Sequence, residues 1–167
     1  MRWYWIDRFL EFESGVRAKA VKNISLAEDH LHDHFPSYPM MPAALIIEGV
    51  AQTGGLLVCE YHAFRQKVVL AKVPRAKFYF EARPGDTLTY SVEIESLHDD
   101  GAIVSATSHR GEELQAELEL VFACLNGEAD RELFDEGDLT HMMRILRAYD
   151  VGRKPDGSPL AEEPATN

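Results

Sequence analysis

Several features that define common protein classes are scarce in this sequence. Only two of its 167 residues are cysteines, and both Cys59 and Cys124 lie inside apolar stretches. This placement predicts buried thiols in a reducing compartment and argues against a disulfide framework. Basic residues are also few: 17 lysines and arginines stand against 28 aspartates and glutamates. The resulting net charge of −11 disfavours nucleic-acid binding.

Targeting and repeat signals are missing as well. The N-terminus "MRWYWIDRF" does not show a basic segment followed by an apolar stretch and a cleavage site. The sequence contains no internal repeat and no glycine-rich phosphate loop in its required context. We therefore expect a cytoplasmic protein without a secretory leader, with a length that suits one substantial hydrophobic core.

The most apolar stretch, residues 43–59, does not have the composition of a membrane span. It is short and carries Glu48, Gln52 and three glycines. A charge in the middle of a bilayer costs roughly 2.5–3.5 kcal/mol on insertion scales. Its length and its alanine and leucine content instead favour a buried helix, with Pro42 at the first helical position.

Alternation of apolar and polar residues predicts strands on both sides of this helix. The pattern occurs at residues 15–25, 67–80, 87–95, 102–109 and 114–124. Tight turns join the last three strands into an antiparallel meander, whereas residues 26–42 form a long loop. The sequence therefore predicts an α+β fold in which an antiparallel sheet wraps around one long central helix.

The C-terminal residues 128–167 differ in composition from the rest of the chain. They hold 5 basic and 10 acidic residues, and a mobile tail is expected at their end. Helical spacing predicts a short amphipathic helix near residues 138–149. Its apolar face consists of Leu139, Met142, Met143, Leu146 and Tyr149. We therefore divide the chain into a domain at residues 1–127 and an acidic extension at residues 128–167.

Three histidines lie close together in "HLHDHFP", residues 30–36. Metallo-hydrolases bind metal through the pattern H-x-H-x-D-H. The run from His30 through His32 to His34 is one residue shorter than this pattern. The loop lacks an obvious further ligand, however, and zinc sites need three or four. Because short matches of this kind are often accidental, we interpret the cluster as a solvated loop without a functional metal.

A carboxylate inside an apolar helix indicates acid–base chemistry. Desolvation is expected to raise the pKa of Glu48, so that it donates a proton near neutral pH. Gln52 follows one turn later on the same helix face and is placed to orient Glu48. With His34 as the base, such a pair suits loss of hydroxide from a substrate that is deprotonated α to a carbonyl. A hydrogen-bonded core glutamate and a loop-capping histidine explain the same residues, and the residues alone leave both interpretations open.

The segment that holds both residues resembles the active-site pattern of the 3-hydroxyacyl-[acyl-carrier-protein] dehydratases, which have the hotdog fold. That pattern reads His-Phe-Pro-Gly, then Pro, Met-Pro-Gly, and a helix with Leu-x-x-Glu-Ala-x-Ala-Gln. This chain reads "HFPSYPMMPA" from His34 and "LIIEGVAQ" from Leu45, with the family's spacing from histidine to glutamate. The segments "AVKNIS" and "AKFYFEARPGDTL" are also similar, so the resemblance covers roughly residues 5–125.

The resemblance implies dehydration of a 3-hydroxyacyl thioester to the trans-2-enoyl thioester without a metal or cofactor. By position, His34 takes the C2 proton, Glu48 protonates the departing hydroxyl, and the backbone N–H of Ala43 polarises the thioester carbonyl. It also implies homodimers, often assembled as a trimer of dimers, in which the histidine of one subunit faces the glutamate of the other. The candidate residues of the acyl tunnel are Phe35, Met40, Met41 and Leu45.

Four positions depart from the family pattern: Asp33, Ser37, Ala43 and Gly49. Ala43 retains its N–H, and alanine is favourable in a helix. Ser37 replaces a glycine, so strain is expected if the backbone there has a positive φ. Asp33 next to His34 favours the imidazolium and weakens the base. These changes indicate a divergent subgroup with an altered acyl length or partner.

Acyl carrier proteins are acidic, so the resemblance also predicts a local basic surface for docking. Residues 65–83 carry a local charge of +5, with Glu81 as their one acidic residue. The candidate docking residues are Arg65, Lys67, Lys72, Arg75, Lys77 and Arg83. An ordinary solvated strand face explains the same charges.

Two alternative functions remain open. The first is another hotdog enzyme, either an acyl thioesterase or an enoyl thioester hydratase. The second is a non-catalytic acyl-carrier-binding subunit that keeps the helix and the dimer surface. Hydration of a crotonyl thioester separates these alternatives from the dehydratase.

Overall fold

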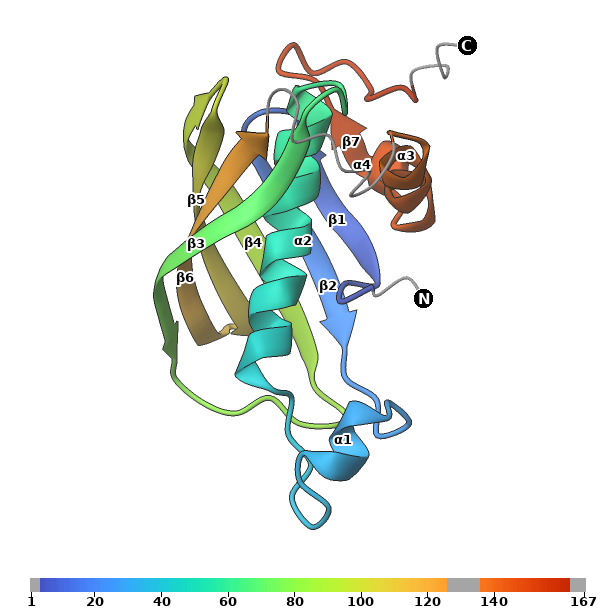
Figure 1. The fold of residues 1–167 in the computed structure, drawn as a ribbon. Helices are drawn as coiled ribbons and strands as arrows, with labels where there is room; N and C mark the ends of the chain where they lie inside the picture. Colours follow the sequence, from blue (N-terminus) through green and yellow to red (C-terminus); the bar gives the residue numbers. More distant parts are fainter. Residues whose placement is uncertain (1–3, 126–135, 163–167) are drawn as a thin grey trace.

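One long helix lies across the concave face of a curved sheet (Figure 1). The computed structural model describes residues 4–125 and 136–162. Within these residues, the helices are α1 (His30–Asp33), α2 (Ala43–Tyr61), α3 (Glu136–Ile145) and α4 (Ala148–Val151). The strands are β1 (Arg8–Glu13), β2 (Arg17–Asn23), β3 (Lys67–Phe78), β4 (Thr87–His98), β5 (Gly101–Arg110), β6 (Glu113–Leu125) and β7 (Gly152–Arg153).

The described strands form one sheet in the order β3-β6-β5-β4-β2-β1-β7. All neighbours pair antiparallel except β1 and β7, which are parallel. The predicted meander corresponds to β4, β5 and β6, and Gly111, with a φ of 58°, allows the tight turn between β5 and β6. The strand predicted at residues 15–25 is β2, and the one predicted at 67–80 is β3.

The helix α2 packs its apolar side chains against this sheet. Ile46, Val50 and Leu57 recur at helical spacing and are at most 1% exposed. The helix α2 is long and apolar enough to cross a membrane. However, 56% of its apolar segment is buried inside the protein, and this burial accounts for the apolar composition. Pro42 lies at the N-cap with an extended ψ of 133°, so the expectation that it occupies the first helical position is wrong.

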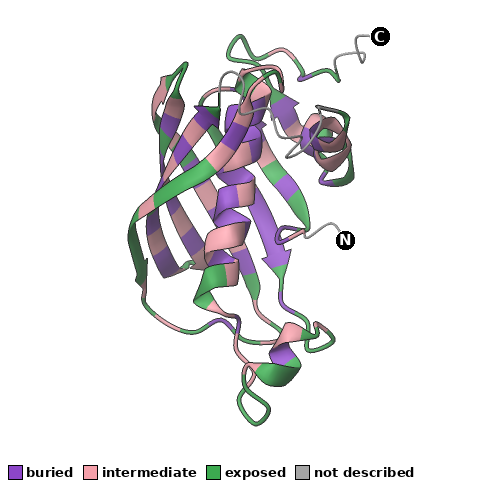
Figure 2. Cartoon of the chain, in the orientation of Figure 1, coloured by how far each residue is buried: buried purple, intermediate pink, exposed green. Residues whose placement is uncertain are grey.

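Buried residues run through the centre of the sheet and along α2, whereas the loop after α1 and the middle of β3 are exposed (Figure 2). The two cysteines are free and buried, as expected from their apolar surroundings. Burial raises the pKa of the Cys59 thiol to about 12. An antiparallel sheet wrapped around one long helix is the hotdog arrangement, so the predicted fold is confirmed.

The C-terminal residues pack against the sheet and continue it. The expected amphipathic helix corresponds to α3 and α4, which are separated at Arg147 by a positive φ of 59°. After them β7 pairs with β1, and Leu160 is 6% exposed. A mobile tail was expected here, but residues 152–162 are held by a strand, a turn and this apolar contact. The boundary predicted near residue 127 lies outside the described residues.

Other differences concern the N-terminal half. Residues 8–13, for which the sequence analysis makes no prediction, form β1. The long loop predicted at residues 26–42 contains one turn of helix, α1, anchored by Leu31 at 1% exposure. This turn sets the point at which the chain enters the segment that carries His34.

Candidate active site

The loop between α1 and α2 holds His34 by its own backbone. The imidazole Nδ1 lies 3.3 Å from the carbonyl oxygen of Met40, and the N–H of Met40 donates to the carbonyl of His34 at 3.0 Å. Phe35 and Tyr38 exchange two backbone hydrogen bonds that close the intervening turn. The ring of His34 stacks on Phe35 with centroids 4.3 Å apart. The histidine is therefore half-buried in a short, closed loop.

The contact with Met40 determines which nitrogen of His34 is free. A carbonyl oxygen only accepts hydrogen bonds, so Nδ1 must carry the proton in this contact. In the neutral ring, Nε2 is then the unprotonated nitrogen that can accept a proton. The loop thus fixes the orientation of the His34 ring through its Nδ1 contact.

The other two histidines of the cluster have different partners. His32 Nε2 lies 3.0 Å from the carbonyl of Leu26, and His30 makes an edge contact with Trp5 at 5.1 Å. Burial lowers the pKa of His30. The three rings therefore do not converge on one point in this loop.

Ser37 does not cause the expected backbone strain. Among the described residues other than glycine, positive φ values occur at Ala63, Phe64 and Arg147. Ser37 is exposed in the turn after Phe35, where a glycine is not required for its conformation.

Glu48 lies in the second turn of α2, and it is half-buried. The amide nitrogen of Gln52 donates to Glu48 Oε1 at 3.0 Å, across one helical turn. The amide oxygen of Gln52 in turn accepts the backbone N–H of Trp5 at 2.9 Å. Because this N–H occupies the oxygen, the nitrogen of Gln52 must point to Glu48. One carboxyl oxygen of Glu48 is thereby held by Gln52.

Glu48 and Gln52 lie in a groove of about 400 Å³ that runs along α2. Except for these two side chains, the residues lining it are apolar or cysteine. Val68 and Leu70 of β3 line it together with Phe122 of β6, and Leu139 and Met142 come from α3. The groove therefore has a polar site and an apolar surface beside it.

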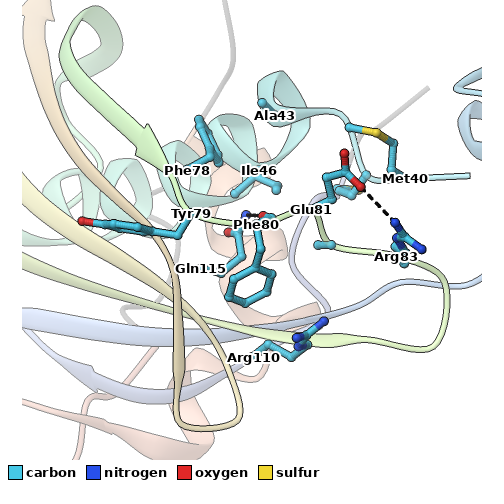
Figure 3. A pocket seen from close by; sticks show the side chains of 12 residues that line it. Met40, Ala43, Ile46, Phe78, Tyr79, Phe80, Glu81, Arg83, Arg110 and Gln115 are labelled. Atoms are coloured by element: carbon cyan, nitrogen blue, oxygen red, sulfur yellow. Dashed lines mark hydrogen bonds and ion pairs between the residues drawn. The ribbon is translucent and has the colours of Figure 1, made fainter.

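A second cavity, of about 640 Å³, lies at the N-terminal end of α2 (Figure 3). Met40, Met41 and Ala43 line it from the loop and the start of the helix. Arg83 pairs with Glu81 at 3.1 Å on its edge. Arg110 and Gln115 also line it, and they could not be predicted from the sequence because no local pattern connects these positions to the helix.

The four residues predicted to form an acyl tunnel are not brought together within one chain. Met40 and Met41 share the cavity at the start of α2, and Met41 is only 2% exposed. Phe35 is 52% exposed, and Leu45 packs against the core. Neither of these two lines the cavity or the groove described above.

The candidate docking residues are spread along β3 and the segments beside it. Lys72, Arg75 and Lys77 are exposed on the strand, but Arg75 pairs with Glu117 at 3.3 Å. Lys77 lies over the ring of Tyr79, 4.5 Å from its centroid. The remaining candidates lie before, at the start of and after the strand: Arg65, Lys67 and Arg83. The predicted surface is therefore partly neutralised by neighbouring glutamates.

Comparison with known proteins decides the family. The FabA-like domain family matches residues 3–113, about two thirds of the chain. The chain belongs to the FabA-like family. A relative from Desulforamulus reducens, named 3-hydroxyacyl-[acyl-carrier-protein] dehydratase FabZ, is 40% identical over 119 residues, which are 71% of this chain and 84% of the relative. A relative of the same name from Clostridioides difficile is 39% identical, with the same coverage of 71% and 84%.

Solved structures support the fold of this FabA-like chain. The protein smu.793 from Streptococcus mutans, bound to acetyl CoA, has a TM-score of 0.60 at 13% identity. The alignment covers 77% of this chain and 95% of that one. Conserved protein PA5202 from Pseudomonas aeruginosa has a TM-score of 0.58 at 17% identity, covering 71% and 87%. At these identities the likeness concerns the fold alone.

Proposed function

We propose that this FabA-like protein dehydrates 3-hydroxyacyl-[acyl-carrier-protein] thioesters to trans-2-enoyl thioesters in fatty-acid or related lipid synthesis. The observation that carries the proposal is the 40% identity to a dehydratase of this name over 71% of the chain. The loop histidine and the helix glutamate supply a base and an acid for this reaction. The alternatives are another hotdog enzyme and a non-catalytic carrier-binding subunit.

His34 acts as the base and Glu48 as the acid. Nε2 of His34 takes the proton from C2 of the substrate, because Nδ1 is held by the Met40 carbonyl. The C2 electron pair forms the new double bond as the C3–O bond breaks. Glu48 gives its proton to the departing hydroxyl, which leaves as water. Gln52 holds the other carboxyl oxygen during this step.

The start of α2 stabilises the charge that develops on the thioester. The first N–H groups of a helix have no partner within it, and they carry the positive end of the helix dipole. Ala43 is the first residue of α2 and is exposed, so its N–H is placed to donate to the thioester oxygen. An alanine at this position supplies that donor as well as a glycine does.

Hydration of a crotonyl thioester, which is the reverse reaction, tests the proposal. Hydration removes the conjugated double bond, so the reaction is measured as a decrease in ultraviolet absorbance. We expect activity in the wild type. His34→Ala and Glu48→Gln each lower the rate by at least about a hundredfold, because each removes one proton-transfer group.

Two matched variants serve as controls. His32→Ala removes a histidine from the same loop, and Glu60→Gln changes a glutamate of the same helix. Both should keep the activity, and circular dichroism should show that all four variants are folded. Release of free thiol in place of hydration would indicate a thioesterase. A wild type that is inert but binds acyl carrier protein would be a non-catalytic subunit.

A further inference from the structure

The groove beside Glu48 has the shape and polarity expected for an extended apolar chain. Between Glu48 and Cys59, which both line it, α2 rises by about 16 Å at 1.5 Å per residue. Its two hydrogen-bonding side chains, Glu48 and Gln52, lie toward the N-terminal part of this stretch. Beyond them the lining is apolar or cysteine, and the volume of about 400 Å³ is in the range of small-molecule sites.

The helix α3 forms one wall of this groove. Leu139 and Met142 face it from α3, whereas Val68 and Leu70 face it from β3. In Figure 1, α3 lies to the right of the C-terminal half of α2, and β3 begins near the C-terminal end of α2 and runs to the left. Thr140 of α3 shares a smaller cavity with Glu60 and Ala63, which places α3 at the C-terminal end of α2. α3 therefore lies near the C-terminal part of α2, whereas Glu48 is in the second turn of this helix.

The helix α3, which forms this wall, belongs to the C-terminal extension. The match to the FabA-like family ends at residue 113, and α3 begins at Glu136. Leu139 is 9% exposed and belongs to the hydrophobic core. Met142 is half-buried and only packs against that core, so its size can change without opening the core itself.

We propose that Met142, supported by Leu139, limits the length of the acyl chain that the groove accepts. The inference rests on the proposed function, since it takes the reacting end of the substrate to lie at Glu48. The apolar chain then runs along α2 toward Cys59 and ends against α3. Met142 is a specificity-determining residue in this arrangement, and it takes no part in proton transfer.

The experiment varies Met142 and measures binding separately from catalysis. Dissociation constants for butyryl-, octanoyl- and dodecanoyl-pantetheine are measured by calorimetry for the wild type, Met142→Trp and Met142→Ala. In parallel, kcat/KM is measured for hydration of the corresponding 2-enoyl thioesters. Ile145→Trp and Ile145→Ala are the matched controls, because Ile145 is an apolar residue of the same helix that is 48% exposed and does not line the groove.

We expect Met142→Trp to raise the dissociation constant of dodecanoyl-pantetheine by about tenfold or more, because excess volume in an apolar site excludes the longer chain. The dissociation constant of butyryl-pantetheine should not change. Met142→Ala should shift the preference toward longer chains. Both Ile145 variants should retain the wild-type profile. The ratios of kcat/KM should follow the binding data.

Other outcomes overturn the inference. An unchanged length profile in Met142→Trp contradicts it, and so does an equal change in Ile145→Trp. A changed native mass without a changed profile would mean that a second copy of the chain fills the groove. A wild type that hydrates no enoyl thioester but binds acyl chains with the expected length dependence would refute the dehydratase and leave the groove assignment intact.

Discussion

Gly49, where the dehydratase pattern has an alanine, is explained by its neighbours in this chain. A Cβ atom at this position would lie 2.6 Å from a ring carbon of Tyr90 and 2.8 Å from the backbone oxygen of Trp5. Tyr90 is fully buried, and Trp5 also donates its N–H to Gln52. The close approach of the N-terminal segment to α2 therefore requires a glycine next to Glu48, the proposed acid.

We predict that Gly49→Ala destabilises the protein by about 1–3 kcal/mol, because Tyr90 or the Trp5 backbone must move. Gly55→Ala is the matched control on the same helix, since a Cβ there would meet its nearest atom, in the ring of Phe122, at 3.4 Å. Removal of a glycine from a helix interior should make this control as stable as the wild type or about 0.5–1 kcal/mol more stable. Urea unfolding at fixed protein concentration measures both changes. Equal free energies of unfolding for the two variants would show that Tyr90 and Trp5 move to accommodate the new methyl group without loss of stability.

At the scale of elements, β3 contributes its side chains to the proposed carrier surface. Arg75 and Lys77 are exposed on this strand, and within residues 4–125 and 136–162 the ion pair of Arg75 is with the partly exposed Glu117. A pair of this kind is worth little, so its arginine remains able to meet an acidic partner. Association with acyl carrier protein should then depend on these charges and on salt.

Reversal of Arg75 and Lys77 to glutamate should raise KM for carrier-bound substrate by about tenfold at low salt, because the double variant repels an acidic carrier. The rate on a short thioester without a carrier should not change. Arg153→Glu with Lys154→Glu is the matched control: it makes the same change of charge at β7, on the opposite edge of the described sheet. Equal losses on both kinds of substrate, or an equal effect of the control, would refute docking on β3.

The elements that could be predicted from the sequence are those with a local cause. An apolar run with Glu48 and Gln52 at i, i+4 predicts both α2 and the contact between these side chains. The role of Trp5 in holding Gln52 was not predictable, because its N–H comes from 47 residues away. Residues 152–162 have the polar, glycine- and proline-containing composition of a tail, yet burial of Leu160 and pairing of β7 depend on the position of β1. The placement of α3 beside the groove likewise depends on tertiary contacts that the local sequence does not indicate.

At the scale of the whole molecule, the cavity next to the His34 loop and the groove at Glu48 are separate spaces within one chain. Met40, whose carbonyl contacts His34, lines the cavity at the start of α2, whereas Glu48 lines the groove, and the two spaces share no lining residue. Among the described strands, β3 lies at one edge of the sheet, and its backbone is open to pairing with a second copy. We therefore propose a homodimer, in which the His34 loop of each subunit faces Glu48 of the other; three such dimers would make the hexamer suggested by the family resemblance.

Mixed dimers test this arrangement directly. Two inactive variants, His34→Ala and Glu48→Gln, are co-expressed and purified through different tags, and their hydration of crotonyl thioester is measured. In a shared-site dimer, each mixed pair regains one of its two sites, so mixed dimers purified through both tags should show roughly half of the wild-type activity. Co-expression of the wild type with the double variant His34→Ala/Glu48→Gln is the control, because its mixed dimers contain no intact shared site. If each chain carried its own site, the two single variants would stay inactive together, and in the control every wild-type subunit would keep its activity inside mixed dimers.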